Sequence, residues 1–469
     1  MRQRVLISAL LAASLLSSCQ QPPPPPVCND AACLVPKLEN ASRILVRNAA
    51  LVITMDPTRG QGPLGTLEEA DVLFEGDALV AVGKGLEPGD ATVVDATGKI
   101  VMPGFVNVHD HLWQTLIRGC ATDQDLYGWL RTCVFPMSNV GLTEEEGHAA
   151  VRLGTVDLIG TGVTTVVDDS HAFNAEFARG NLRALDESGL RYVFAHCGSE
   201  DRFDEMRSIH AQLATRTPGA SFQVCSHPAS FMQSSLDQST SLARALGVPL
   251  NVHLAENLKD LNDDQMASLQ RANAFGGKVL ANHVIHVTAE EMDILARHDV
   301  RVAHNPLSNM RLASGIMRLG EMRAKGLKVG LGLDGGTNDS ADAFANMKAA
   351  IGLQRALHKD ASVYPSVTDV LWLATMGGAE VLDMQDSIGS LTPGKKADLL
   401  IIDPNATNFA PRWDWLSQLV FNGQPSNVEY VFIGGRVRKA GGEVLNVKRE
   451  QLLQSMQAAV ARVKAALGY

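Results

Sequence analysis

Val106-Asn107-Val108-His109-Asp110-His111 is a short apolar run that ends in two histidines separated by one residue. Side chains alternate between the two faces of a β-strand, so His109 and His111 point the same way. Further apolar runs that end in metal-binding or acid/base side chains lie at residues 250–256, 279–283 and 329–334. Because a parallel barrel gathers the carboxyl ends of its strands on one face, we expect these four ends to meet around one metal ion.

The middle of the chain alternates between strand-like and helix-like segments, which predicts an α/β fold. The predicted strands are residues 105–109, 164–168, 191–196, 222–226, 250–253, 279–283, 301–304 and 328–334. Eight such strands over the length of about one barrel indicate a (β/α)8 TIM barrel rather than an open doubly wound sheet. The main nucleotide-binding folds are excluded, because no G-x-G-x-x-G opens a helix and no G-x-x-x-x-G-K-[ST] occurs.

Short runs of β-hairpin character flank the barrel on both sides, with Gly and Pro between them. We therefore expect a small composite β-sandwich domain that is built from both ends of the chain, with the barrel inserted. Apolar side chains at helical spacing predict a helix at the carboxyl end. The expected boundaries are 42–103 and 385–446 for the sandwich, 104–384 for the barrel and 447–469 for the C-terminal helix.

The first residues resemble a bacterial lipoprotein signal. Arg2 and Arg4 precede an apolar run over residues 5–16 that is too short to span a bilayer as a helix. The run leads into Leu16-Ser17-Ser18-Cys19, which resembles the lipobox, where processing leaves a lipidated cysteine. We expect a signal peptide over residues 1–18 and a lipid on Cys19, and an ordinary secretory peptide is the alternative.

Lipidation predicts the compartment of the mature chain. Residues 19–41 contain an unbroken proline run at 22–26 and are typical of an extended tether. Gln20 resembles the sorting signal for the outer membrane. We expect a protein of the bacterial cell envelope on the periplasmic side, in which the lipid anchor is the only contact with the membrane.

Charge and composition narrow the range of partners. With 45% hydrophobic and 20% charged residues, the chain has the composition of a globular protein that can bury a sizeable core. Removal of residues 1–18 lowers the count of Lys and Arg from 41 to 39 against 51 Asp and Glu, so the net charge changes from -10 to -12. Because the chain is negatively charged, we expect no nucleic acid partner. A homo-oligomer is possible.

The cysteines suit an oxidising compartment. Besides Cys19, the pairs Cys28–Cys33 and Cys120–Cys133 are candidates for disulfide bonds, although sequence alone leaves the connectivity open. Free buried thiols are the alternative, and Cys197 and Cys225 are left without an assigned partner.

The histidines at the strand ends predict a metal site. His109 and His111 can bind one ion together, and His253 and Asp334 would add a third imidazole and a carboxylate oxygen. Three nitrogens and one oxygen suit Zn²⁺, and Fe²⁺ and Mn²⁺ are alternatives because such ligands discriminate weakly.

The chain resembles the amidohydrolase superfamily, within the branch of guanine, 8-oxoguanine and S-adenosylhomocysteine deaminases and triazine hydrolases. The resemblance extends from residue 42 to about residue 440, in the family's order. The motifs that carry it are Pro103-Gly104-Phe105-Val106-Asn107-Val108-His109-Asp110-His111, His253-Leu254-Ala255-Glu256, Asn282-His283-Val284-Ile285-His286, His304-Asn305-Pro306-Leu307-Ser308-Asn309, Leu333-Asp334-Gly335 and Pro393-Gly394-Lys395-Lys396-Ala397-Asp398-Leu399.

The resemblance implies roles for the strand-end residues. His109, His111, His253 and Asp334 would bind the metal, which lowers the pKa of a bound water. Asp334 would also take the proton of the attacking water, and Glu256 would protonate the ring nitrogen beside the attacked carbon. His283 would orient the water or polarise the leaving group. A solvated loop acid and a structural core histidine are the alternatives for Glu256 and His283.

A single metal is expected. Relatives with two metals commonly bridge them with a carboxylated lysine from the middle of the barrel. This chain has no lysine between Lys99 and Lys259, so the corresponding strand cannot supply that bridge. We therefore expect one divalent ion per chain, with zinc favoured.

Substrate contacts are predicted on the segments that follow the first strand. Gln114 resembles a position that hydrogen-bonds heterocycle amides in guanine-type deaminases, and Trp129 would stack on a flat ring. The alternatives are an amide on the loop surface for Gln114 and packing between barrel and helices for Trp129. Adenosine-type deaminases grip ribose hydroxyls with a glutamate, but the corresponding stretch, residues 134–138, has no acid. A site without this partner should discriminate poorly for ribose, so nucleosides are disfavoured as substrates.

The predicted function is the hydrolytic deamination of an aromatic nitrogen heterocycle of the purine, pyrimidine, pterin or triazine type, by a hydrolase that acts on carbon–nitrogen bonds other than peptide bonds. The alternatives are a cyclic or linear amidase that uses the same site, and a non-catalytic lipoprotein that binds such a ligand.

Overall fold

The protein contains a parallel barrel, as predicted. The structure is a computed structural model that describes residues 31–215, 219–337 and 340–468. Within these residues, one sheet has eight parallel strands in chain order. They are β6 (Phe105–Asp110), β7 (Val163–Ser170), β8 (Arg191–Cys197), β9 (Ala220–Ser226), β10 (Leu250–Leu254), β11 (Val279–His283), β12 (Arg301–His304) and β13 (Lys328–Leu331). The last strand ends at Leu331, before the predicted Asp334.

Hydrogen bonds between the segment after the last strand and the first strand close the barrel. The backbone N–H groups of Leu333 and Asp334 both donate to the carbonyl oxygen of His109, over 3.0 Å. The N–H of Leu333 also lies 3.0 Å from the side-chain oxygen of Asn107. Closure therefore carries the segment after β13 to the carboxyl end of β6, where the predicted metal ligands are.

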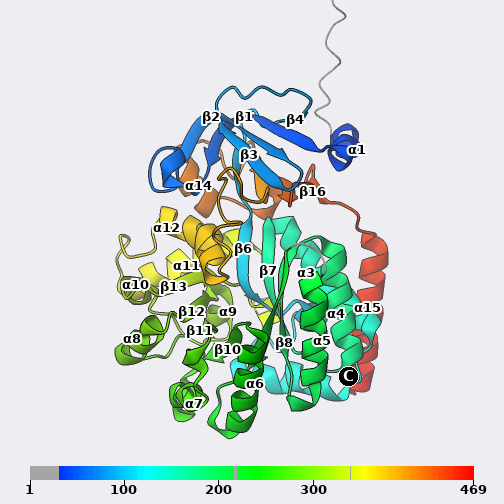
Figure 1. Cartoon of the computed structure of the whole chain (residues 1–469), viewed down its shortest axis with the longest axis vertical. Helices are drawn as coiled ribbons and strands as arrows, with labels where there is room; N and C mark the ends of the chain where they lie inside the picture. The colour runs from blue at the N-terminus through cyan, green and yellow to red at the C-terminus, as the bar shows by residue number, and fades with distance from the viewer. Residues whose placement is uncertain (1–30, 216–218, 338–339, 469) are drawn as a thin grey trace, which may run out of the picture.

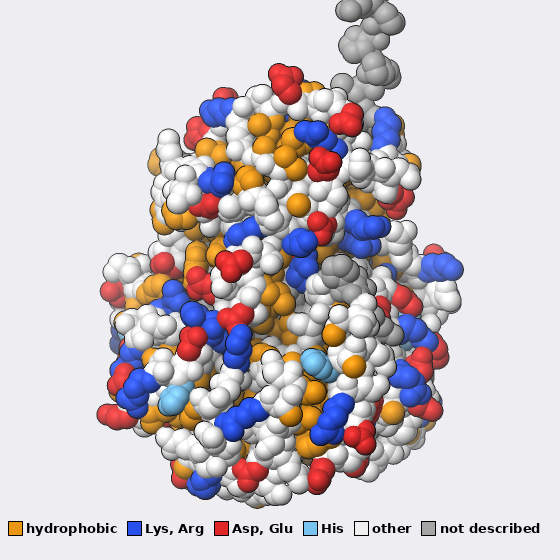
Figure 2. Space-filling model, viewed as in Figure 1, with side chains coloured by type: hydrophobic (Ala, Val, Ile, Leu, Met, Phe, Trp, Pro, Cys, Tyr) orange, Lys and Arg blue, Asp and Glu red, His pale blue; other side chains and the backbone are white. Residues whose placement is uncertain are grey.

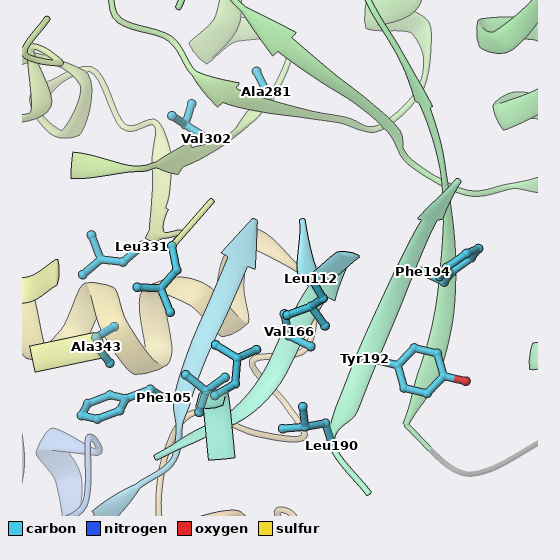
Figure 3. Close-up of a cluster of buried hydrophobic side chains, with 14 of the residues drawn as sticks. Phe105, Leu112, Val166, Leu190, Tyr192, Phe194, Ala281, Val302, Leu331 and Ala343 are labelled. Atoms are coloured by element: carbon cyan, nitrogen blue, oxygen red, sulfur yellow. The ribbon is translucent and has the colours of Figure 1, made fainter. Parts of the chain in front are cut away.

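Helices cover the outside of the barrel, so its strands are buried on both faces. All residues of β6 and β7 are buried, and Figure 3 shows Phe105, Val166 and Leu331 among the hydrophobic side chains of this core. The long covering helices are α3 (Glu144–Thr161), α4 (Ala175–Ser188), α5 (Phe203–Thr215), α6 (Gln233–Leu246), α8 (Ala289–Arg297) and α11 (Ala343–His358). Shorter helices lie on the connections, namely α2 (Leu126–Trp129), α7 (Gln265–Arg271), α9 (Pro306–Arg311), α10 (Leu319–Ala324), α12 (Val367–Trp372), α13 (Gly378–Val381) and α14 (Trp415–Phe421).

A second sheet contains strands from both ends of the chain. This confirms the prediction that the sandwich domain is built from two separate segments with the barrel between them. Figure 1 shows its early strands in blue beside late strands in orange, at one end of the molecule. The strands described in this sheet are β1 (Arg43–Ile53), β2 (Thr66–Glu75), β3 (Ala78–Gly83), β4 (Thr92–Asp95), β5 (Ile100–Pro103), β14 (Leu399–Ile402), β15 (Val428–Ile433), β16 (Arg436–Ala440) and β17 (Glu443–Val444). β5 and β14 pair antiparallel, with Pro103 opposite Leu399, and so join the two halves. The exact domain boundaries stay a prediction.

The chain departs from expectation at the predicted tether. That tether was expected to reach residue 41, but Ala31–Asn40 form helix α1. Leu34 and Leu38 of this helix are buried in the core of the second sheet, because their spacing of four residues places both on one helix face. The predicted signal peptide, the predicted lipidation site Cys19 and the proline run lie outside the described residues. No described helix is long and apolar enough for a membrane span.

The predicted C-terminal helix is present as α15 (Arg449–Ala466), which lies against α3 (Figure 1). Met456 and Val463 are buried on its inner face, as their helical spacing predicts. Arg462 forms an ion pair with Glu146 of α3. On the face in Figure 2, acidic and basic side chains are interspersed rather than separated.

Two disulfide bonds lie wholly within the described residues. Cys120–Cys133 confirms one candidate pair, whereas the bond between Cys197 and Cys225 was not anticipated. The two cysteines are 28 residues apart in the chain, so no local spacing predicts their bond. They become adjacent because β8 and β9 run side by side. Cys28 lies outside the described residues.

Candidate active site

The four predicted metal ligands come together at the carboxyl ends of the barrel strands. His109 Nε2 lies 3.0 Å from Asp334 Oδ1, and His111 Nε2 lies 3.4 Å from the same oxygen. His111 Nε2 is also 3.2 Å from His253 Nε2. The tertiary fold thus brings together residues that are up to 225 positions apart in the chain.

The donor atoms fit a divalent cation. His111 Nε2 carries a lone pair, because the Nδ1 proton of this ring is donated to the carbonyl oxygen of Asp169, and a cation bound there would be shared with His253 Nε2, 3.2 Å away. Ligand atoms of two overlapping groups lie within 4.8 Å of one another, namely His109, His111, Asp169 and His253, and His109, His253, His283 and Asp334. Imidazole nitrogens with a carboxylate oxygen are a usual donor set for zinc.

Asp169 positions two of these histidines, and sequence analysis missed it. His111 Nδ1 donates to the carbonyl oxygen of Asp169 over 2.6 Å, since a carbonyl oxygen can only accept. His109 Nδ1 lies 3.4 Å from Asp169 Oδ2. Partners of this kind fix the tautomer of a metal-binding imidazole, so both Nε2 atoms are directed at the cluster. The one available signal was that Asp169 directly follows a predicted strand end.

Backbone conformation at two positions also marks the site. His283 ends β11 with a φ of 70°, and Asp334, just beyond β13, has a φ of 65°. Residues with a side chain seldom adopt this left-handed region, and those that do cluster at functional sites. The hydrogen bond from Asp334 N–H to His109 holds the second of these turns in place.

The surroundings push the pKa values of two carboxyl groups in opposite directions. Burial acts to raise the pKa of Asp334, but the hydrogen bond with His109 and the nearby imidazoles hold it well below its ordinary value. Ser308 Oγ also donates to Asp334. For Glu256, burial and then the negative charges of Asp334 and Asp260 raise the pKa well above its ordinary value. Asp334 is therefore held as a base and Glu256 as an acid.

His283 lies between these two carboxyl groups. Its Nε2 atom is 3.5 Å from Glu256 Oε2 and 3.9 Å from Asp334 Oδ2. On the other side of the ring, Nδ1 lies 2.9 Å from the side-chain oxygen of Asn309, to which it donates. Burial lowers the pKa of His283 to about 4, so the imidazole is neutral at pH 7.

The two predicted substrate contacts are buried on the segments that follow β6. Gln114 lies in the short helix η2 (Leu112–Ile117), and Trp129 ends α2. Gln114 Oε1 and Trp129 Nε1 have no hydrogen-bond partner among the described residues. A Cβ placed on Gly336 would lie 2.8 Å from Gln114 Cβ, so Gln114 packs against the segment that follows Asp334.

His171, another residue that sequence analysis missed, lies beside the cluster. Its ring centroid is 5.0 Å from that of His111, and its Nδ1 accepts a hydrogen bond of 2.9 Å from Trp113 Nε1. Burial lowers the pKa of His171 to about 3, so it is neutral at pH 7. Its position after β7 follows no spacing pattern that the sequence reveals.

Comparison with known proteins identifies the family. The sequence profile of the amidohydrolase family matches residues 100–438. The chain is 31% identical over 443 residues to a 5-methylthioadenosine/S-adenosylhomocysteine deaminase of Desulforudis audaxviator, with 90% of this chain and 99% of that protein covered. It is 29% identical over 447 residues to a 5'-deoxyadenosine deaminase of Methanobrevibacter smithii, with 90% and 98% covered.

A solved structure shows the same architecture. An adenosine deaminase from Xanthomonas campestris with bound zinc superimposes with a TM-score of 0.82 at 25% identity. The superposition covers 90% of this chain and 98% of the other.

Proposed function

The chain belongs to the amidohydrolase family and is a hydrolase of carbon–nitrogen bonds other than peptide bonds, and we propose that it removes the amino group from an aromatic nitrogen heterocycle. One observation carries the proposal: the carboxyl groups of Glu256 and Asp334 lie 3.5 Å and 3.9 Å from His283 Nε2, in surroundings that raise the pKa of Glu256 and lower that of Asp334. A base and an acid held this close together suit the addition of water across a carbon–nitrogen double bond.

We propose that His109, His111, His253 and Asp334 hold one divalent ion, and that this ion is zinc. When bound, such an ion supplies Lewis acidity that lowers the pKa of water. The close approach of the four side chains supports the proposal, as does the zinc in the related adenosine deaminase structure.

The carboxyl groups move the protons in this proposal. Asp334 accepts a proton from the attacking water, and Glu256 donates its proton to the ring nitrogen next to the attacked carbon. That donation prevents negative charge from building up on the ring. His283 accepts a hydrogen bond at Nε2 and so orients the water, because its Nδ1 proton is engaged by Asn309. Asp334 then passes its proton to the amino group, which leaves as ammonia as the carbon–nitrogen bond breaks, while the new hydroxyl loses its proton to Glu256 and becomes the carbonyl.

We propose that Gln114 and Trp129 bind the heterocycle. Gln114 Oε1 is buried without a hydrogen-bond partner among the described residues and would be satisfied by a ring or amino N–H, and the buried Trp129 would contact the heterocycle with its flat apolar ring. Relatives that are deaminases of adenosine derivatives support a purine-type base. Residues 134–138 contain no acid that could bind ribose hydroxyls, and the exposed Ser138 donates to the carbonyl oxygen of Phe135 over 2.7 Å. We therefore propose a free base rather than a nucleoside.

Release of ammonia from a panel of compounds tests this function. The zinc-loaded protein is incubated with purines, pyrimidines, pterins and triazines, with adenine and adenosine compared directly. We expect ammonia from an aminated heterocycle, at a rate that is about 10²–10⁴ times lower in the Glu256→Gln variant. Hydrolysis of cyclic amides without any deamination would instead support the amidase alternative.

We also propose that the mature chain is a lipoprotein of the cell envelope, anchored through Cys19. The lipobox-like sequence supports the anchor. The disulfides Cys120–Cys133 and Cys197–Cys225 support an oxidising compartment. Inhibition of signal peptidase II in the host should leave an unprocessed precursor, and normal processing under the inhibitor would contradict the anchor.

A further inference from the structure

A pair of cysteines lies beside the predicted metal ligands, and the proposed reaction does not use it. Cys197 ends β8 and faces Cys225 of β9 in register, and the two are joined by a disulfide bond. Cys225 is 4% exposed and Cys197 is half-buried. A small reagent can therefore approach the pair from the side of Cys197.

Asp169 connects this pair to the predicted metal ligands. Its Oδ1 atom is 3.0 Å from Cys197 Sγ, while its Oδ2 atom is 3.4 Å from His109 Nδ1. Oδ2 also lies 3.4 Å from Asn282 Nδ2, which comes from β11 on the opposite side of the barrel. The carboxylate is therefore inside the barrel, between the sulfur atoms and the histidines.

The contact between Asp169 and Cys197 suits a reduced sulfur better than a disulfide. A disulfide sulfur has no proton to donate to a carboxylate, so the oxidised Cys197 cannot stabilise the Asp169 oxygen at 3.0 Å with a hydrogen bond. A thiol would donate a hydrogen bond across this distance, and a cation would draw a thiolate and the carboxylate together.

We propose that Cys197, Cys225 and Asp169 form a second cation site once the disulfide is reduced. The ligand atoms of these three residues lie within 4.8 Å of one another. Two thiolates and a carboxylate select a thiophilic divalent ion such as Zn²⁺. The oxidised protein then binds one ion and the reduced protein two, with Asp169 in contact with both sites.

Formation of the second site takes two steps, which are reduction of the disulfide by thiol–disulfide exchange and then binding of the cation. A dithiol reductant supplies two electrons and two protons, the bond between the two Sγ atoms breaks, and the reductant becomes a cyclic disulfide. Binding of the cation then releases the two thiol protons to solvent.

The second disulfide of the described chain provides a matched control. Cys120 and Cys133 are also joined, but neither belongs to a group of potential metal ligands among the described residues. Reduction of that bond should create no comparable site.

Cobalt(II) titration after treatment with a dithiol tests the proposal. The reduced wild-type protein should take up one additional equivalent of Co²⁺ and gain sulfur-to-cobalt charge-transfer absorption in the near ultraviolet. The band should persist in Cys120→Ser/Cys133→Ser and be lost in Cys197→Ser/Cys225→Ser. Because the predicted catalytic ligands contain no sulfur, this band reports the new site independently of deamination. A band that survives in Cys197→Ser/Cys225→Ser would overturn the proposal.

A measurement on the wild-type chain avoids dependence on the folding of the variants. After reduction, the protein is alkylated with and without Co²⁺, and the modified peptides are quantified by mass spectrometry. Co²⁺ should protect Cys197 and Cys225 at least tenfold and leave Cys120 and Cys133 unprotected. Equal alkylation of all four cysteines in the presence of Co²⁺ would refute the site.

Discussion

Asp334 is bound to His109 twice. Its backbone N–H donates to the carbonyl oxygen of His109 over 3.0 Å, and its carboxylate lies 3.0 Å from Nε2 of the same residue. The first bond closes the barrel, and the second belongs to the predicted metal cluster. Barrel closure and ligand position therefore depend on each other at this point.

We expect Asp334→Asn to lose bound metal while it keeps the fold. The amide can retain the backbone hydrogen bond but carries no charge for the cation or for a proton. Turnover should fall by about 10²–10⁴, and the zinc content should fall below one equivalent per chain. Metal analysis, circular dichroism and ammonia release measure these effects. Asp386→Asn, an exposed site, is the control, and full zinc occupancy in Asp334→Asn would contradict the ligand assignment.

Glu256→Gln should separate acid catalysis from metal binding. The amide has almost the same shape but cannot release a proton to the ring, so kcat should fall by about 10²–10⁴. Zinc content should be unchanged, because Glu256 is not among the predicted ligands. Steady-state kinetics and metal analysis check both points, with the exposed Glu290→Gln as the control. A variant that keeps wild-type kcat would exclude Glu256 as the acid.

Asp169→Asn should weaken metal binding without removing a predicted ligand. The carboxylate orients His109 at 3.4 Å, and loss of such a partner lowers metal affinity by about 10–100-fold. Competition with a chromophoric chelator gives the dissociation constant. Asp157→Asn, whose side chain pairs with Arg118 on the surface, should bind zinc as the wild type does. Equal affinity in both variants would show that Asp169 has no positioning role.

Glu205 should make stability depend on acid pH. Burial acts to raise the pKa of this carboxyl, but His196 and Arg202 lower it to about 2, from an ordinary 4.5. A folded-state pKa below the unfolded value stabilises the protein above about pH 4.5, and this contribution disappears as the pH falls towards 2. Thermal unfolding of wild type and Glu205→Gln should therefore differ at pH 7 and converge at low pH.

The exposed neighbour Asp204 offers the control for this measurement. Asp204 pairs with Arg207 on the surface, and its side chain is fully exposed. Asp204→Asn should have nearly the wild-type midpoint at every pH, because solvent and salt screen the charges of an exposed pair, which then contributes little to stability. A constant difference between wild type and Glu205→Gln from pH 7 to pH 3 would count against the pKa assignment.

Most of the fold was predicted from the periodic spacing of apolar residues along the chain. The strands that contain His109, His253 and His283 were recognised because apolar runs with polar ends are local features of the chain. The helix at residues 31–40 was not predicted, because it follows a proline run. Its two buried leucines pack against the second sheet, and this contact cannot be read from the local sequence.

The sequence by itself determined the barrel, the composite sheet and the types of side chain at the strand ends, because period and residue type are properties of neighbouring positions. Only the tertiary structure decided that Asp169 supports His109 and His111, and that Cys197 faces Cys225. Those contacts depend on the register between parallel strands and on barrel closure. Hydrogen bonds between residues far apart in the chain set both, so no local pattern can reveal them.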